Sequence, residues 1–319
     1  MQRVAVLLLK AAVTALLIYL SVRAVSLDAV RERFESLQFG WIVFVVAVLA
    51  AQIAVQAMRW REIVQAAGAR LSAGASLQIS YIAAFFNQTL PSTIGGDAAR
   101  VWILAHPYKA GWRAAAYSVL VDRAIGVFAL AALVVACLPW TVEFVRDPVA
   151  RLTVAAIGMA GVLGGLVFAG LGMAKGTWLD RFWLTHHFVA ASGALRKLLR
   201  QPRRFLTVAA ASIFIHIVTV AVAWAAARSI AEPLDFIVTL CLLPPVVLLA
   251  TIPVTIAGWG LRESLMITAF TLAGQDAGDA LAISLIMGAA NFVVGLFGGL
   301  LWLTGRFGRV ETAGLRARR

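Results

Sequence analysis

Two short segments place the residues that could do chemistry where a chain this apolar should cross a membrane. The first reads FFNQTLPSTIGGDAAR (Phe85–Arg100) and the second reads TIPVTIAGWGLRES (Thr251–Ser264). Each passes from apolar residues through Pro and Gly to an acidic residue and an Arg. The Arg guanidinium binds phosphate oxygens through two parallel hydrogen bonds, and polar residues inside membrane spans mark functional sites. The two segments therefore form the candidate site.

The candidate ligands are three arginines, an amide and a hydroxyl. We expect these side chains to contact a phosphate or another anionic group: Arg100, Arg123, Arg262, Asn87 and Ser92. Three carboxylates would form a supporting charge network: Asp97, Asp122 and Glu263. Asp97 and Arg100 are three positions apart, so they can pair on one helical turn. Arg262 and Glu263 are adjacent, so each is expected to reach a different partner.

A static ion-pair network that only holds the two segments together is the alternative interpretation of these charges. An isolated charge at the membrane centre costs at least about 2.5–3.5 kcal/mol, so pairing is expected in either case. His216 and Asn291 are polar residues within predicted spans, and we expect both to form hydrogen bonds between helices.

The sequence carries no pattern typical of catalysis or metal binding. Cysteine and histidine do not occur at metal-ligand spacing, and no Gly-rich phosphate loop with Lys is present. Cys137 and Cys241 lie in apolar runs and are interpreted as buried thiols. We therefore predict no enzymatic activity, no metal and no cofactor. If the polar cluster acted on a lipid-linked substrate, Asp97 or Glu263 would be the candidate acid or base.

The composition is that of a membrane protein. Of 319 residues, 62% are hydrophobic and only 13% are charged, against about 25% charged in soluble domains. The apolar runs are continuous, which favours helices over a β-barrel. The net charge is +13, and the basic residues stand beside apolar runs, which indicates anionic lipid contact and not nucleic-acid binding. The excess of Arg over Lys and the abundance of Ala favour a bacterial inner membrane protein.

Six apolar runs are interpreted as full crossings of the bilayer, which takes about 20 helical residues. They are Val4–Val22, Trp41–Met58, Ala116–Leu138, Leu152–Gly172, Leu206–Ala227 and Ala280–Leu303. The basic loop at about 173–205 and the basic tail at 304–319 are predicted to face the cytoplasm, and the count of spans puts the N-terminus there too. Arg59, Arg61 and Arg70 assign the loop after the second span to the same side.

Two further apolar segments lie at about 77–113 and about 236–273. All the basic loops fall on the cytoplasmic face only if each of these segments enters the membrane and returns to the face from which it entered. Residues that end helices or permit turns lie at the expected tips: Pro91, Gly95, Gly96, Pro253, Gly258 and Gly260. We therefore predict an all-α polytopic fold in a single domain, 1–319. It has about six full spans and two opposed re-entrant hairpins, arranged as an inverted repeat.

The motif FFNxxLPSxxGGDxxR, the following SVLVDRAIG and the later PVTIAGWGLRE resemble the lysylphosphatidylglycerol synthase transmembrane family. The resemblance covers nearly the whole chain and implies a flippase-like membrane domain. One departure is Asp122-Arg123, where the family usually has Glu-Arg. Fused members carry an aminoacyl-transferase domain after the membrane part. None follows here, so the resemblance implies a stand-alone member with the lipid-translocating part only.

These observations predict a translocase for an anionic or phosphate-bearing lipid, of phospholipid or polyprenyl-phosphate type. Two alternatives stay open: a membrane-embedded enzyme acting on a lipid-linked substrate, and a non-transporting subunit of a lipid or cell-envelope pathway. The expected partner is a membrane lipid, and a second copy of the chain or a protein of lipid biosynthesis stays open as a further partner.

Overall fold

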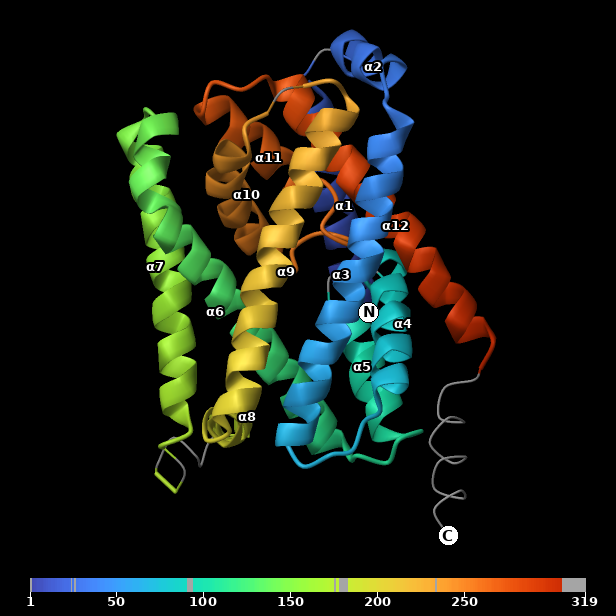
Figure 1. The fold of residues 1–319 in the computed structure, drawn as a ribbon, viewed down its shortest axis with the longest axis vertical. Coiled ribbons are helices and arrows are strands. Elements are labelled where there is room, and N and C mark those ends of the chain that lie inside the picture. The colour runs from blue at the N-terminus through green and yellow to red at the C-terminus, as the bar shows by residue number, and fades with distance from the viewer. Residues whose placement is uncertain are drawn as a thin grey trace.

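The computed structural model describes residues 2–23, 25, 27–90, 94–174, 176–177, 183–232 and 234–305. In this part of the chain the secondary structure is entirely helical, which confirms the predicted all-α polytopic class (Figure 1). The helices are α1 (Gln2–Arg23), α2 (Leu27–Glu35), α3 (Phe39–Ala66), α4 (Ala73–Thr89), α5 (Gly95–Ala105), α6 (Trp112–Phe144), α7 (Pro148–Leu171), α8 (Trp183–Leu199), α9 (Pro202–Ser229), α10 (Phe236–Ala250), α11 (Leu261–Leu272) and α12 (Ala277–Leu303).

Five of these helices are long and apolar enough to cross a membrane, namely α3, α6, α7, α9 and α12. The sixth predicted span corresponds to α1, whose 22 residues would extend about 33 Å. Several helices begin at residues suited to satisfy their free N–H groups. Asp147 accepts a hydrogen bond from the Val149 N–H ahead of α7, with Pro148 at the first helical position. Asp235 and Asp276 cap α10 and α12 in the same way.

Two pairs of shorter helices occupy the positions of the predicted hairpins. α4 and α5 have 17 and 11 residues, and α10 and α11 have 15 and 12. At 1.5 Å per residue none of the four exceeds about 26 Å, less than the roughly 30 Å of a hydrocarbon core. The α4–α5 pair lies toward the lower end of the molecule and the α10–α11 pair toward the upper end (Figure 1).

The tips of the two pairs differ in how they use glycine. Pro91 falls outside the described residues, as does Ser92. Gly95 and Gly96 are the first residues of α5 and have helical backbone, so they do not form the turn itself. In the second pair the turn carries Pro253, and both Gly258 and Gly260 adopt φ of +82°, a conformation that favours glycine.

The packing of the helices repeats itself with inverted direction. α3 to α6 form a long–short–short–long series, and so do α9 to α12. α3 packs against α9, α4 packs against α12, and α10 packs correspondingly against α6. The chain descends through α3 and ascends through α9 (Figure 1). Exchanging the two series therefore preserves the contacts while reversing the direction, which is the arrangement expected of an inverted repeat.

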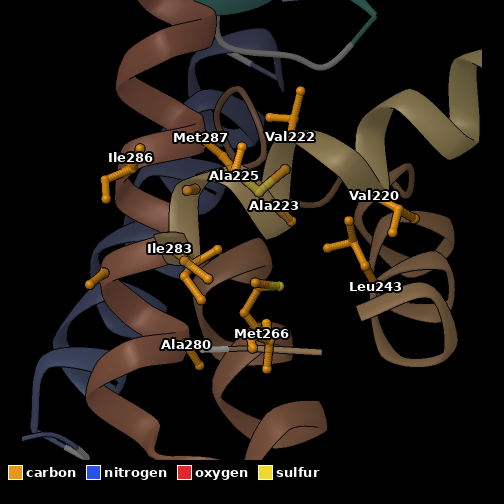
Figure 2. Close-up of a cluster of buried hydrophobic side chains, with 14 of the residues drawn as sticks. Val220, Val222, Ala223, Ala225, Leu243, Met266, Ala280, Ile283, Ile286 and Met287 are labelled. Carbon is orange, nitrogen blue, oxygen red and sulfur yellow. The ribbon is translucent and has the colours of Figure 1, made fainter. Parts of the chain in front are cut away.

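Small side chains allow these helices to approach closely. The largest cluster of buried apolar residues joins α9, α10, α11 and α12, with Ala223, Ala225 and Ala280 beside Leu243 and Met266 (Figure 2). Between α4 and α12 the contact is closer still, because a Cβ added at Gly298 would collide with the Tyr81 carbonyl. Membrane helices associate through such contacts, since lipid supplies little hydrophobic driving force between them.

The basic loop predicted at about 173–205 contains α8, which carries Arg196 and Lys197 in its last turn and an exposed Trp183 at its start. Basic side chains and an aromatic at one helix are typical of an interfacial segment. Of the predicted tail at 304–319, residues 306–319 lie outside the described residues.

Candidate functional site

Polar side chains from α3, α4, α5, α6 and α9, together with Thr251 at the end of α10, line a cavity of about 260 Å³ inside the bundle, here called the chamber. Its charged lining consists of Arg59 from α3, Asp97 and Arg100 from α5, and Asp122 and Arg123 from α6. α9 and the end of α10 complete the wall through His216, Thr219 and Thr251. The chamber therefore joins both halves of the inverted repeat.

Asp122 lies at the centre of the chamber's charges and bridges two arginines. Its Oδ1 accepts a hydrogen bond from Arg59 Nε at 2.9 Å, and its Oδ2 accepts one from Arg100 Nη1 at 3.2 Å. The three side chains are 6–11% exposed. Arg59 Nη1 also donates to Ser212 Oγ on α9 at 3.2 Å. This network ties α3, α5, α6 and α9 together at one point.

Asp97 does not pair with Arg100 as the spacing predicts. Its Oδ2 accepts a 2.6 Å hydrogen bond from Arg123 Nε on α6. The partner of Arg100 is Asp122, so each ion pair runs between helices and none runs along α5. The Asp97 side chain is 11% exposed and the Arg123 side chain 42%, so the chamber's outer edge is formed by a cation.

The chamber holds more positive than negative charge. Three guanidinium groups face two carboxylates, which leaves a formal charge of +1 with His216 neutral. Arg100 is 9% exposed, and its Nε is a buried donor without a hydrogen-bond partner among the described residues. The Arg100 guanidinium also lies over the Trp60 ring, at 5.3 Å from its centroid. The excess positive charge favours an anion, and the buried Nε–H needs a hydrogen-bond acceptor.

The first turn of α5 is held toward the chamber by Asn87. The Asn87 Oδ1 accepts a hydrogen bond from the Gly96 N–H at 2.8 Å, which satisfies one of the free donors at the helix start. A Cβ added at Gly96 would collide with the Ala83 carbonyl and the Asn87 side chain. α5 can therefore approach α4 this closely only with glycine at this position.

Arg262 and Glu263 lie in a second polar cluster, apart from the chamber lining. They do not reach different partners: Arg262 Nη2 donates to Glu263 Oε1 at 2.6 Å. Ser284 Oγ donates to the same oxygen, while Glu263 Oε2 accepts the Gly260 N–H at 2.6 Å. Adjacent residues can pair here because Glu263 folds back over the helix start. Arg262 Nε also donates to Ser284 Oγ at 2.9 Å, and the guanidinium lies over the Trp259 ring at 5.2 Å from its centroid.

Comparison with known families agrees with the membrane-spanning fold. The family model described as "Lysylphosphatidylglycerol synthase TM region" matches residues 7–299. The chain belongs to this family. No curated protein and no solved structure matches the chain. Membership in the lysylphosphatidylglycerol synthase TM family, together with the apolar helices, identifies a multi-pass membrane protein associated with lipid-related processes.

For this member of the family, sequence reasoning overlooked one wall of the chamber. Arg59 was expected in a cytoplasmic loop, but α3 continues to Ala66 and buries it. Gln52, Gln56 and Arg59 recur at helical spacing and all line the chamber. That polar stripe on an otherwise apolar helix is the signal that identifies the wall. Gln52 Nε2 is anchored on α9, where it donates to the Ile215 carbonyl and to Thr219 Oγ1.

The two polar residues of the long spans behave differently. His216 contacts the Gly126 carbonyl of α6 through Nε2 at 2.9 Å, the expected bond between helices. Asn291 donates to the Met287 carbonyl of its own helix at 2.8 Å, so the expected interhelical bond is replaced by one within α12. Among the described residues no cluster suited to a metal ion occurs.

Proposed function

We propose that this protein moves a phosphate-bearing lipid between the leaflets of the membrane, and that the chamber holds the lipid's phosphate during the passage. The observation that carries the proposal is the chamber's unbalanced positive charge beside the buried, unsatisfied Nε of Arg100. A phosphodiester supplies one negative charge and two acceptor oxygens, which matches both features. Arg100 and Arg123 would bind the phosphate, while Asp97 and Asp122 hold the arginines in place.

The inverted repeat supports movement through the chamber. In transporters of this architecture the substrate site lies near the bilayer midplane at the boundary of the two repeats. The chamber lies at such a boundary, because α3, α5 and α6 belong to one repeat and α9 and α10 to the other. Following the positive-inside rule, we place the basic loops at the cytoplasmic face of a bacterial inner membrane.

The enzymatic alternative needs a carboxyl group free to exchange a proton with a substrate. Asp97 is hydrogen-bonded to Arg123, and Glu263 accepts bonds from Arg262, Ser284 and the Gly260 backbone. Carboxyl groups held by arginines in this way are better suited to fix those cations than to transfer protons. The geometry therefore favours binding and translocation over catalysis.

The test is lipid translocation by purified protein in proteoliposomes. Phosphatidylglycerol, phosphatidylethanolamine and a polyprenyl phosphate, each carrying a fluorophore, would be exposed to a quencher added outside. Arg100→Gln should slow translocation about tenfold or more, because a hydrogen bond to a charged group contributes about 1.5–3 kcal/mol and 1.4 kcal/mol is a factor of ten. Arg31→Gln, on a surface residue whose side chain is 80% exposed, should translocate like wild type.

Each outcome decides between the functions. Transfer of at least one phosphate lipid that Arg100→Gln abolishes, in protein that elutes and melts normally, supports the proposal. Wild-type protein that moves none of the lipids contradicts it. Mass spectrometry of the recovered lipids separates the enzymatic alternative, since a chemically altered lipid would replace translocation as the primary activity.

A further inference from the structure

A second hollow adjoins the chamber on the membrane side. It is an apolar groove of about 810 Å³ between α5 and α6, lined also by Thr251 at the end of α10, and is here called the lateral groove. Its apolar walls include Ile94, Val101 and Trp102 from the α5 side and Ala116, Val119 and Leu120 from α6. These walls offer no binding free energy to a phosphate, whereas a hydrocarbon chain would be stabilised by apolar contact with them.

The lateral groove and the chamber share part of their lining. Asp97, Arg123, Val127 and Thr251 border both hollows. The Asp97–Arg123 ion pair therefore stands at the boundary, with charged groups on one side and apolar walls on the other. A molecule that crosses this boundary must have a charged part and a hydrocarbon part, joined within a few ångströms.

The lateral groove runs along the first half of α6. Trp112 begins α6 and is the first α6 residue in the groove's lining, and Val127 is the last. At 1.5 Å per residue the rise between them is about 22 Å, against roughly 30 Å for the hydrocarbon core. Trp102 and Trp112 are 43% and 54% exposed and flank His106, with ring centroids 5.4 and 5.0 Å from it. Exposed tryptophans at a helix end are typical of the membrane interface.

We propose that the lateral groove seats an acyl chain of the same lipid whose phosphate occupies the chamber, and that the lipid enters between α5 and α6 past the Asp97–Arg123 pair. This rests on the proposed function and narrows its substrate to lipids with a phosphodiester next to long hydrocarbon chains. Charge complementarity at the inner end and continuity with the chamber identify the occupant as a phospholipid chain.

The first experiment uses wild-type protein and phosphatidylglycerol with a photoactivatable diazirine in mid-chain. Crosslinks should map to the lateral groove as well as to the general lipid-facing surface, for which the exposed Leu163 of α7 is the reference. Soluble glycerophosphoglycerol has the head group but no chains and should compete with the lipid for the chamber. It should reduce the yield of groove crosslinks about tenfold, because the chain in the groove is held there by its linked phosphate. The yield of crosslinks at Leu163 should not change. Equal displacement at both places, or none at either, overturns the proposal.

The second experiment fills the lateral groove. Ala98→Trp and Ala116→Trp each add bulk from one wall, and Ala160→Trp adds the same bulk at an exposed position of α7. The groove variants should bind soluble glycerophosphoglycerol as wild type does and translocate phosphatidylglycerol about tenfold or more slowly, as expected when steric bulk removes one subsite. The Ala160→Trp variant should do both normally.

The two proposals fail in different ways. Normal translocation by both groove variants overturns the lateral groove as a chain seat and leaves the chamber untouched. Normal binding of glycerophosphoglycerol by Arg100→Gln overturns the chamber as a phosphate site, and with it the proposed function.

Discussion

Asp97 on α5 accepts a 2.6 Å hydrogen bond from Arg123 on α6, and both residues line the chamber and the lateral groove. The carboxylate is nearly buried, while the guanidinium is 42% exposed. Under the proposed function, Arg123 would be the first cation that an incoming phosphate meets, and Asp97 would be the anion with which that phosphate competes. Exchange of Asp97 for a phosphate would cost little free energy, since a partly exposed ion pair contributes only about 0.2–1 kcal/mol.

Asp97→Asn should separate binding from translocation. The substitution removes the competing anion and raises the formal charge of the chamber from +1 to +2. Glycerophosphoglycerol should bind up to about fivefold more tightly, the equivalent of the roughly 1 kcal/mol of a partly exposed pair. Phosphatidylglycerol should translocate more slowly, because release becomes harder. Calorimetry and the quenching assay measure the two effects, and a variant with weaker head-group binding would contradict this role of Asp97.

Asp122→Asn should destabilise the fold more than any other single charge removal in the chamber. It leaves two nearly buried arginines, Arg59 and Arg100, without their shared carboxylate. Removing one partner of a buried ion pair costs about 3–5 kcal/mol. The matched control is Glu35→Gln, whose partner Arg31 lies at the surface with both side chains more than half exposed; it should cost under about 1 kcal/mol. Thermal unfolding in detergent compares them, and equal stability of the two variants would refute a central role for Asp122.

The sequence pattern was sufficient to locate the charged segments but not to pair their residues. Spans and hairpins follow from hydropathy and loop charge, which report the position of each residue along the membrane normal. Pairing depends on how helices are rotated and which helices are neighbours, and the local spacing of Asp97 and Arg100 carries no information about α6. Arg59 was misassigned for a related reason, because a helix can continue beyond its apolar run and bury a charge that meets a partner.

Arg262 is a second residue whose surroundings could not be predicted from its local sequence. Its motif is related to that of Arg100, with glycines before a charged helix start, and the sequence therefore assigned both to one site. In the structure α1 packs against α11, and Thr14 accepts a hydrogen bond from the Ile256 N–H at 2.9 Å. The segment that carries Arg262 is thus covered by α1, a helix that belongs to neither repeat. Related motifs thus acquire different environments through an element that their own sequences do not specify.

Gly96→Ala should disrupt the start of α5, whereas Gly74→Ala should not disturb α4. A methyl group at Gly96 would collide with the Ala83 carbonyl and Asn87, while at Gly74 it would meet nothing within 4 Å. Overpacking of this kind costs about 1–3 kcal/mol, and the control should gain up to about 1 kcal/mol, because alanine is favoured over glycine inside helices. Unfolding temperatures and head-group binding measure both variants. Undiminished binding by Gly96→Ala would show that the position of α5 does not matter for the chamber.

Cysteine accessibility tests whether the short helix pairs return to the face from which they enter. Cys137 and Cys241 are both buried, so labelling from either side should report introduced cysteines alone. Arg70→Cys and Lys109→Cys flank α4–α5, and Ala231→Cys and Gln275→Cys flank α10–α11. In oriented membrane vesicles the first two should react with an impermeant maleimide from the side of the basic loops, and the last two only from the opposite side. Labelling of Arg70→Cys and Lys109→Cys from opposite sides would make α4–α5 a full crossing and contradict the predicted re-entrant hairpin.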